Sequence, residues 1–99
     1  MSVKIKIPVF LQKFTSGEKI IETEPGRLLD VLSEVIKRFP ELKNRLFNSG
    51  GVLKSYVKTY SVSNSDNPMI SKNPKKFLET SDIIKDGETI IIMMPIAGG

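Results

Sequence analysis

Apolar and polar residues alternate near the start of the chain. Every second position is apolar in the set Val3, Ile5, Ile7, Val9 and Leu11. A period of two is typical of a strand with one buried face, so residues 3–11 are predicted to form one. Pro8 has no amide hydrogen and is expected at a bulge or where pairing ends. Residues 15–17 then predict a reversal, and residues 19–23 a second strand antiparallel to the first.

A helical period follows the break at Glu24-Pro25-Gly26. The apolar residues that recur at helical spacing are Leu28, Leu29, Leu32, Val35, Ile36 and Phe39. This stripe predicts an amphipathic helix that faces the core and ends before Pro40. Residues 41–47 are expected to add a short helical turn, and residues 48–51 form a loop.

The second half of the chain is rich in strand-forming residues. A third strand is predicted within residues 53–62, followed by a polar loop at residues 63–68. Residues 69–80 predict an irregular segment with a short strand or turn. A turn at residues 85–88 leads into residues 89–94, which are apolar at both parities. That run predicts a central strand covered on both faces, in parallel pairing.

This order of elements in 99 residues is an α+β pattern. It predicts a mixed four- to five-stranded sheet with one main helix packed on one face, and the first and last strands side by side at its centre. We expect a single folded domain over residues 1–95 and an extended tail over residues 96–99.

Composition excludes several classes of function. The chain contains no His and no Cys, so it lacks the commonest general base, the commonest metal ligand and any thiol. Its net charge of +4 comes from bases that are scattered along the sequence, only three of them Arg, which argues against a nucleic-acid partner. No run of apolar residues is long enough to cross a membrane, and the start has no signal-peptide stretch. We therefore expect a cytoplasmic protein that is no enzyme, binds no metal and does not act at a membrane.

The last five residues carry the candidate chemistry. The final strand runs into Pro95-Ile96-Ala97-Gly98-Gly99. Two glycines have no Cβ, so such a tail can thread a channel too narrow for other residues and bring its carboxylate to a nucleotide held by another protein. Pro95 stiffens the base of the tail because its φ is fixed.

Several motifs, spread over almost the whole chain, are similar to those of the MoaD/ThiS proteins. They are the opening Val3–Pro8, the helix after Glu24-Pro25-Gly26, the turn Lys85-Asp86-Gly87-Glu88 and the ending Pro95-Ile96-Ala97-Gly98-Gly99. The resemblance implies the β-grasp fold of ubiquitin. The sequence departs from that family's third-strand pattern at residues 56–64, which leaves the subfamily open.

The resemblance implies a ubiquitin-like sulfur carrier. An E1-like adenylyltransferase of the MoaB/MoeB/ThiF type would use ATP to activate the Gly99 carboxylate, and a sulfur donor would then form a thiocarboxylate. The acceptor would be an enzyme such as the large subunit of a molybdopterin synthase, in molybdenum cofactor biosynthesis. The carrier itself would bind no cofactor.

Other candidate residues concern partner binding. Gly98, Ala97, Ile96 and Pro95 would line the entry to a partner channel. The candidates for a partner-facing surface are Phe10, Met93, Met94, Lys58, Lys75 and Lys76. Core packing of the apolar ones and simple solvation of the lysines are the alternatives. Three other functions stay open: a sulfur carrier for cysteine, thiamine or tRNA thiolation, a protein modifier joined to lysines through Gly99, and an interaction module in which the tail plays no part.

Overall fold

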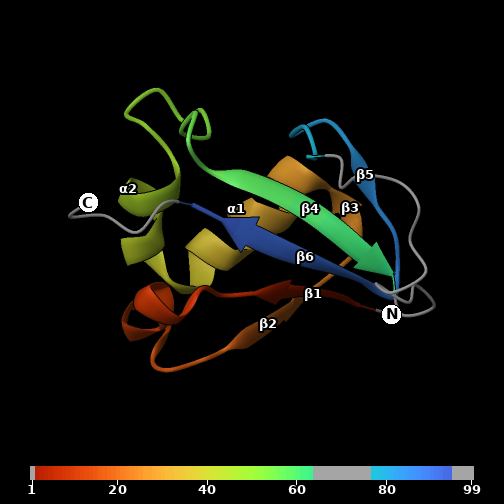
Figure 1. The fold of residues 1–99 in the computed structure, drawn as a ribbon, viewed down its shortest axis with the longest axis horizontal. Coiled ribbons are helices and arrows are strands. Elements are labelled where there is room, and N and C mark those ends of the chain that lie inside the picture. Colours follow the sequence, from red (N-terminus) through yellow and green to blue (C-terminus); the bar gives the residue numbers. More distant parts are fainter. Residues whose placement is uncertain (1, 64–76, 95–99) are drawn as a thin grey trace.

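One mixed sheet with four strands organises the chain. The computed structural model describes residues 2–63 and 77–94. The strand order is β2-β1-β6-β4, and the strands are β1 (Val3–Lys6), β2 (Ile20–Thr23), β4 (Lys58–Ser63) and β6 (Glu88–Met93). β4 and β6 cross in front of α1 (Leu28–Arg38) in Figure 1, so this helix covers the far face of the sheet. The predicted α+β architecture is confirmed.

The first and last strands lie side by side at the centre of the sheet, as predicted. β1 pairs in parallel with β6, with Ile5 opposite Ile90, while β2 and β4 add to the two sides in antiparallel pairing. The turn before β6 holds the start of the chain: the Ser2 amide donates to Asp86 Oδ1 at 2.6 Å, and the Gly87 amide donates to the Ser2 carbonyl at 2.9 Å. Two segments far apart in the sequence are thus held in register at the centre of the sheet.

The first strand is shorter than its pattern predicted. Regular pairing stops at Lys6, Ile7 adds one bond to the Lys19 carbonyl at 2.8 Å, and a 3₁₀ helix, η1 (Val9–Thr15), begins after Pro8. Pro8 therefore lies where pairing ends, as expected. The prediction of a strand through residue 11 is wrong, because a period of two continues by coincidence into a tight helix. Positive φ angles at Ser16 (55°) and Gly17 (82°) then reverse the chain into β2.

The main helix has the predicted extent, but its buried face differs slightly from the predicted apolar stripe. Its fully buried residues are Leu28, Val31, Leu32 and Val35, while Leu29 is 36% exposed. The predicted stripe therefore included Leu29 wrongly and missed Val31, since both lie near the edge of the apolar face. The helix N-terminus is anchored by the segment before β6, where Asp82 and Thr80 carbonyls accept from the amides of Leu28 and Leu29.

A second, two-stranded sheet went unpredicted. β3 (Gly26–Arg27) pairs antiparallel with β5 (Ile83–Ile84). Each strand has two residues, too few to produce a period in the sequence. This small sheet fixes the entry of α1 against the segment that leads to β6.

Short helical turns follow α1. The predicted turn after Pro40 is present as η2 (Pro40–Leu42) and α2 (Lys43–Leu46). The third strand, β4, starts at Lys58, later than the beginning of the predicted window, because Leu53 forms only an isolated bridge to Phe47. The polar loop was expected to begin at Ser63, which is instead the last residue of β4; the rest of that loop and most of the irregular segment predicted at residues 69–80 lie outside the described residues.

The central strand β6 is buried on one face only. Ile90 and Ile92 point to the helix and are 0% and 5% exposed, whereas Ile91 is half-buried and Met93 is 46% exposed on the opposite face. The prediction that both faces are covered is therefore wrong within the described part of the chain. The open face of the sheet keeps apolar side chains in contact with solvent.

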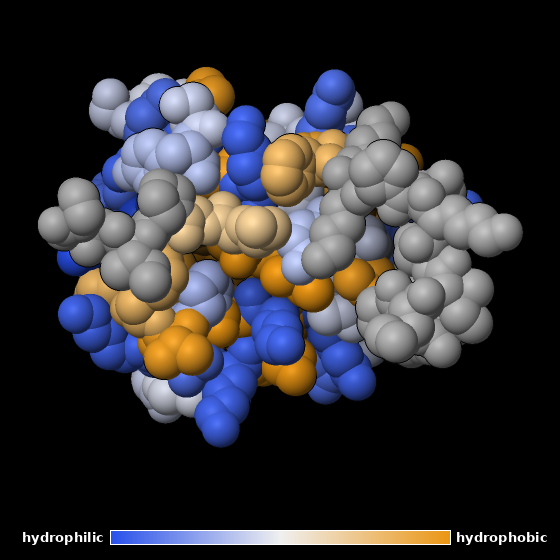
Figure 2. All heavy atoms as spheres, viewed as in Figure 1, coloured by the Kyte–Doolittle hydropathy of each residue, from blue (hydrophilic) through white to orange (hydrophobic). Residues whose placement is uncertain are grey.

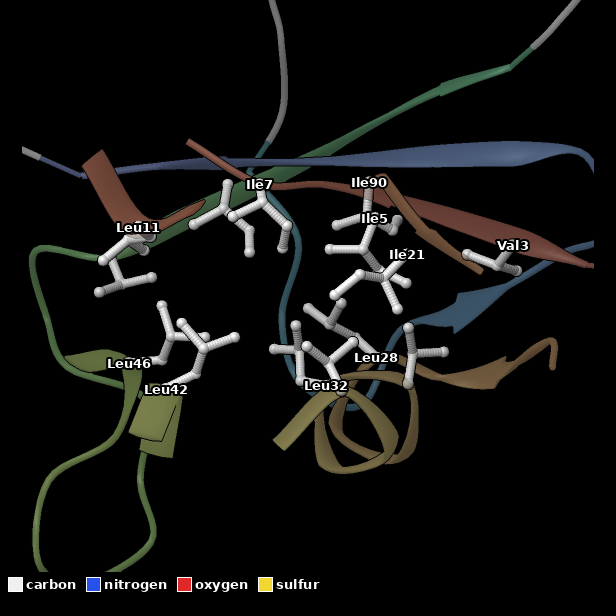
Figure 3. Close-up of a cluster of buried hydrophobic side chains, with 14 of the residues drawn as sticks. Val3, Ile5, Ile7, Leu11, Ile21, Leu28, Leu32, Leu42, Leu46 and Ile90 are labelled. Atoms are coloured by element: carbon white, nitrogen blue, oxygen red, sulfur yellow. The ribbon is translucent and has the colours of Figure 1, made fainter. Parts of the chain in front are cut away.

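The core lies between the sheet and the helical segments. Figure 3 shows Ile5, Ile21 and Ile90 pointing from the sheet toward Leu28 and Leu32 of α1, and Leu11 of η1 pointing toward Leu42 and Leu46. All seven of these side chains in the sheet, α1, η2 and α2 are at most 4% exposed, and Leu11 is 2% exposed. The core therefore continues from beneath the sheet to the cap formed by η1, η2 and α2.

Two buried threonines allow the cost of unpaired polar groups to be tested. The Thr15 hydroxyl donates to the Glu18 carbonyl at 2.8 Å, while Thr59 Oγ1 has no hydrogen-bond partner among the described residues. We expect Thr15→Val to lower the free energy of unfolding by about 0.5–1.5 kcal/mol, because it removes the hydrogen bond that the buried Thr15 hydroxyl makes. Thr59→Val should leave it unchanged or raise it by up to about 1 kcal/mol.

Urea unfolding of both variants measures the difference. Both side chains are nearly inaccessible, at 0% and 1% exposed, so their burial is matched. Equal losses in the two variants would contradict the hydrogen-bonding difference between the two sites.

Candidate functional site

Three neighbouring strands meet at the end of the sheet that leads to the tail. β6 ends there at Met93, β4 begins there with Lys58 opposite Met93, and β1 passes there into η1. We call this end of the sheet, together with η1, η2, α2 and residues 54–58 beside it, the tail edge. η1 contacts η2, and α2 lies beside η1 at the same end of the sheet (Figure 1). β6 therefore ends in the middle of the sheet, with β1 on one side and β4 on the other.

The candidate residues of the tail lie outside the described part of the chain. The same holds for two of the predicted partner-binding lysines. These residues are Pro95, Ile96, Ala97, Gly98, Gly99, Lys75 and Lys76. The tail chemistry consequently remains a prediction, and the described structure shows the surface from which the tail departs.

Of the remaining candidates, two are accessible and two are packed. Met93 is 46% exposed and its cross-strand neighbour Lys58 is also exposed, both on the open face of the sheet. Phe10 and Met94 are partly buried and pack against the hydrophobic core. The structure thus brings Met93 and Lys58 together at the tail edge and gives Phe10 and Met94 a packing role.

Two exposed apolar residues at the tail edge were missed from the sequence. Val9 is 82% exposed and Tyr56, just before β4, is 47% exposed. Strand parity predicted that Val9 is buried and Phe10 faces the open side of the sheet. Because these residues lie in η1, Val9 is exposed and Phe10 packs against the core. The signal that could have revealed this is Pro8, since a proline that ends strand pairing also ends the strand's parity.

The open face combines apolar and basic side chains. In the row across the four strands, Ile20 pairs with Lys6, Lys6 with Ile91, and Ile91 with Tyr60. Figure 2 shows this side of the molecule, with apolar patches interrupted by hydrophilic side chains. Aromatic and long aliphatic side chains beside charged ones are typical of surfaces that bind other proteins.

Basic side chains at the tail edge are held against aromatic rings. The Arg45 guanidinium lies 4.7 Å from the centre of the Phe14 ring, and Lys13 Nζ lies 5.3 Å from the same ring. Lys54 Nζ lies 5.8 Å from the centre of the Tyr56 ring. Such contacts restrict where the cations can go while leaving their charge available.

Within residues 2–63 and 77–94, no group of three His, Cys, Asp or Glu side chains is placed to hold a metal ion. In the same residues, no helix has the length and apolar character that crossing a membrane requires.

No model of a known protein family matches the chain, and no curated protein sequence matches it. Solved structures do. A chain of the BexX/CysO complex from Amycolatopsis orientalis is 28% identical with a TM-score of 0.71, and the match covers 98% of this chain and 99% of that one. SAMP1 from Haloferax volcanii is 17% identical with a TM-score of 0.74 over the full length of both chains. CysO from Mycobacterium tuberculosis is 24% identical with a TM-score of 0.68, covering 95% of this chain and 99% of that one.

These similarities define the class of fold. The chain has the ubiquitin-like β-grasp fold, as the resemblance implied. The matches extend over nearly the whole length of the chains compared.

The exchanged positions of Val9 and Phe10 can be tested by substitution. Phe10→Ser should lower the free energy of unfolding by about 2–4 kcal/mol, because it removes a ring that packs against the core. Val9→Ser should change it by less than about 0.5 kcal/mol, since the side chain is largely in solvent. Thermal unfolding of the two variants provides the measurement, and a larger loss for Val9→Ser would show that the strand continues beyond Pro8.

Proposed function

We propose that this protein is a ubiquitin-like carrier whose Gly99 carboxylate is activated by an E1-like enzyme and converted to a thiocarboxylate. The observation that carries the proposal is the position of β6. It lies between β1 and β4 in a β-grasp sheet and leads directly into Pro95-Ile96-Ala97-Gly98-Gly99. A rigid central strand gives the tail a fixed starting point on an otherwise small protein.

Covalent geometry limits how far such a tail can act. Five residues span at most roughly 17 Å when fully extended. The carboxylate can thus reach a nucleotide well inside a partner while the sheet stays at the partner's surface. Gly98 and Gly99 would occupy the narrowest part of the channel, with Ala97, Ile96 and Pro95 at its entry.

The proposed chemistry has two steps. A carboxylate oxygen of Gly99 attacks the α-phosphorus of ATP, and pyrophosphate leaves. A hydrosulfide-equivalent sulfur nucleophile then attacks the acyl carbon, and AMP leaves with the original carboxylate oxygen. The product is a C-terminal thiocarboxylate, which is a better nucleophile than the carboxylate and can pass its sulfur to an acceptor.

The catalytic groups of this cycle belong to the partners. The chain has neither His nor Cys, so it supplies the reacting carboxylate and a binding surface. The activating enzyme, of the MoaB/MoeB/ThiF type, holds ATP. The acceptor we propose is an enzyme such as the large subunit of a molybdopterin synthase, by analogy with MoaD/ThiS proteins; cysteine, thiamine and tRNA thiolation are the other destinations for the sulfur.

A second candidate function is the modification of proteins. It is favoured by the fold shared with small archaeal modifier protein 1 from Haloferax volcanii and Methanosarcina acetivorans. A modifier uses the same adenylate, but a lysine amine attacks the acyl carbon, AMP leaves and an isopeptide bond forms. Lysine side chains of host-cell proteins joined to a C-terminal fragment of this chain that ends in Gly98-Gly99 would support this candidate, and a proteome without them would exclude it.

Activation can be measured by ATP–pyrophosphate exchange with the cognate E1-like enzyme. We expect Gly98→Val to reduce exchange by at least about tenfold, because a branched side chain cannot enter a channel shaped for glycine. Deletion of Gly98-Gly99 should abolish it.

The control adds the same side chain elsewhere. Ser81→Val alters an exposed position at the opposite end of the sheet and should leave exchange unchanged. Circular dichroism confirms that each variant is folded. Full exchange with Gly98→Val would contradict a channel shaped for glycine, and full exchange with the chain that lacks Gly98-Gly99 would rule out the carrier function.

A further inference from the structure

Charge is separated along the sheet, although it is scattered along the sequence. Among the described residues, the ranges 13–19, 37–46 and 54–58, which form the tail edge or adjoin it, contain eight basic and two acidic residues. Residues 22–30 and 79–88, at the opposite end, contain seven acidic and two basic residues. The fold therefore places a positive surface where β6 ends and a negative one where β6 begins.

Chain topology produces this separation. β1 and β6 run in parallel, so both carboxyl ends meet at the tail edge, where β4 begins and β2 is entered. α1 ends at the same edge, because η2 follows it directly and contacts η1. The turn at residues 85–88 and the β3–β5 sheet lie at the other end, beside the start of α1.

The basic side chains at the tail edge are free to meet a partner. Within the described residues the one ion pair is Arg27–Asp30, at 3.1 Å, and it lies at the opposite end. Lys13, Arg45 and Lys58 are all exposed. Arg45 and Lys13 are positioned by the Phe14 ring, so part of the entropy cost of fixing them is met before any partner binds.

Exposed apolar side chains lie among these cations. Val9 follows the end of β1, Met93 ends β6 and Tyr56 precedes β4, and these strands are neighbours in the sheet. Apolar and aromatic residues inside a charged rim are the usual anatomy of a protein-binding surface.

We propose that the tail edge docks onto an acidic surface of the enzyme that receives the tail, with Val9, Tyr56 and Met93 at the centre and Lys13, Arg45, Lys54 and Lys58 in the rim. The inference rests on the proposed carrier function for the identity of that enzyme. Acidic side chains around the partner's pocket for the tail would attract the basic rim. This attraction speeds the encounter of the two proteins and sets the orientation in which the tail enters.

A protein fits this surface better than a nucleic acid does. Six of the eight basic residues that lie at the tail edge or adjoin it are Lys, whereas bidentate recognition of phosphate favours Arg. A phosphate backbone would also repel the carboxylate of the tail. An acidic protein with a pocket among its carboxylates can take up the tail and pair with the rim together.

Charge reversal at matched positions tests the surface. Lys58→Glu lies in the rim, and Lys85→Glu makes the same change in net charge at an exposed position at the opposite end. In exchange assays with the cognate E1-like enzyme at low salt, Lys58→Glu should raise KM for the carrier by about five- to tenfold with kcat unchanged. Lys85→Glu should leave KM within about twofold of the unaltered chain. Added salt should reduce the difference in KM between the unaltered chain and the two variants.

The apolar centre has its own pair of variants. Tyr56→Ser should raise KM, while Ile83→Ser, which removes an exposed apolar side chain at the opposite end, should not. Equal effects of Lys58→Glu and Lys85→Glu, or of the two serine variants, would overturn the docking surface even if adenylation proceeds.

Direct binding separates this inference from the carrier function. A chain that lacks Gly98-Gly99 cannot be adenylated, yet it should still bind the same enzyme with a salt-dependent Kd that Lys58→Glu weakens. If exchange is absent but this binding is found, the carrier function fails and the docking surface stands. Tighter binding to a single-stranded oligonucleotide than to the enzyme at physiological salt would contradict an acidic protein partner.

Discussion

The parallel pairing of β1 with β6 is the constraint on which the rest of the structure depends. It joins the first and last described strands at the centre of the sheet, with Ile5 opposite Ile90. The turn at Asp86 and Gly87 holds the start of the chain through hydrogen bonds of 2.6 and 2.9 Å and thereby sets the register. A shift of one residue would turn the buried isoleucines to solvent, so the hydrophobic core permits a single alignment.

The functional arrangement follows from that pairing. β6 is paired with β1 as far as Ile91 and with β4 as far as Met93, so the strand is held in the sheet before the chain reaches Pro95. The same geometry carries η1 and the start of β4 to this edge, together with their exposed apolar and basic side chains. A reactive tail and a surface able to recognise its partner are therefore two consequences of one topology.

Sequence patterns predicted the elements better than their details. The period of α1 and the turn at residues 85–88 are strong local signals, and both were predicted correctly. The end of β1 was not, because Val9 and Leu11 stay in phase with a strand although η1 has begun. The β3–β5 pairing and the gathering of lysines at the tail edge depend on contacts between distant segments, which no local pattern contains.

Sulfur transfer to Gly99 is tested most directly by intact mass spectrometry of the full chain after incubation with ATP, the cognate E1-like enzyme and a sulfur donor. We expect the mass change of one oxygen replaced by sulfur, located at Gly99. An unchanged mass with every candidate activating enzyme, while partners still bind a chain that lacks Gly98-Gly99, would contradict it and favour a simple interaction module.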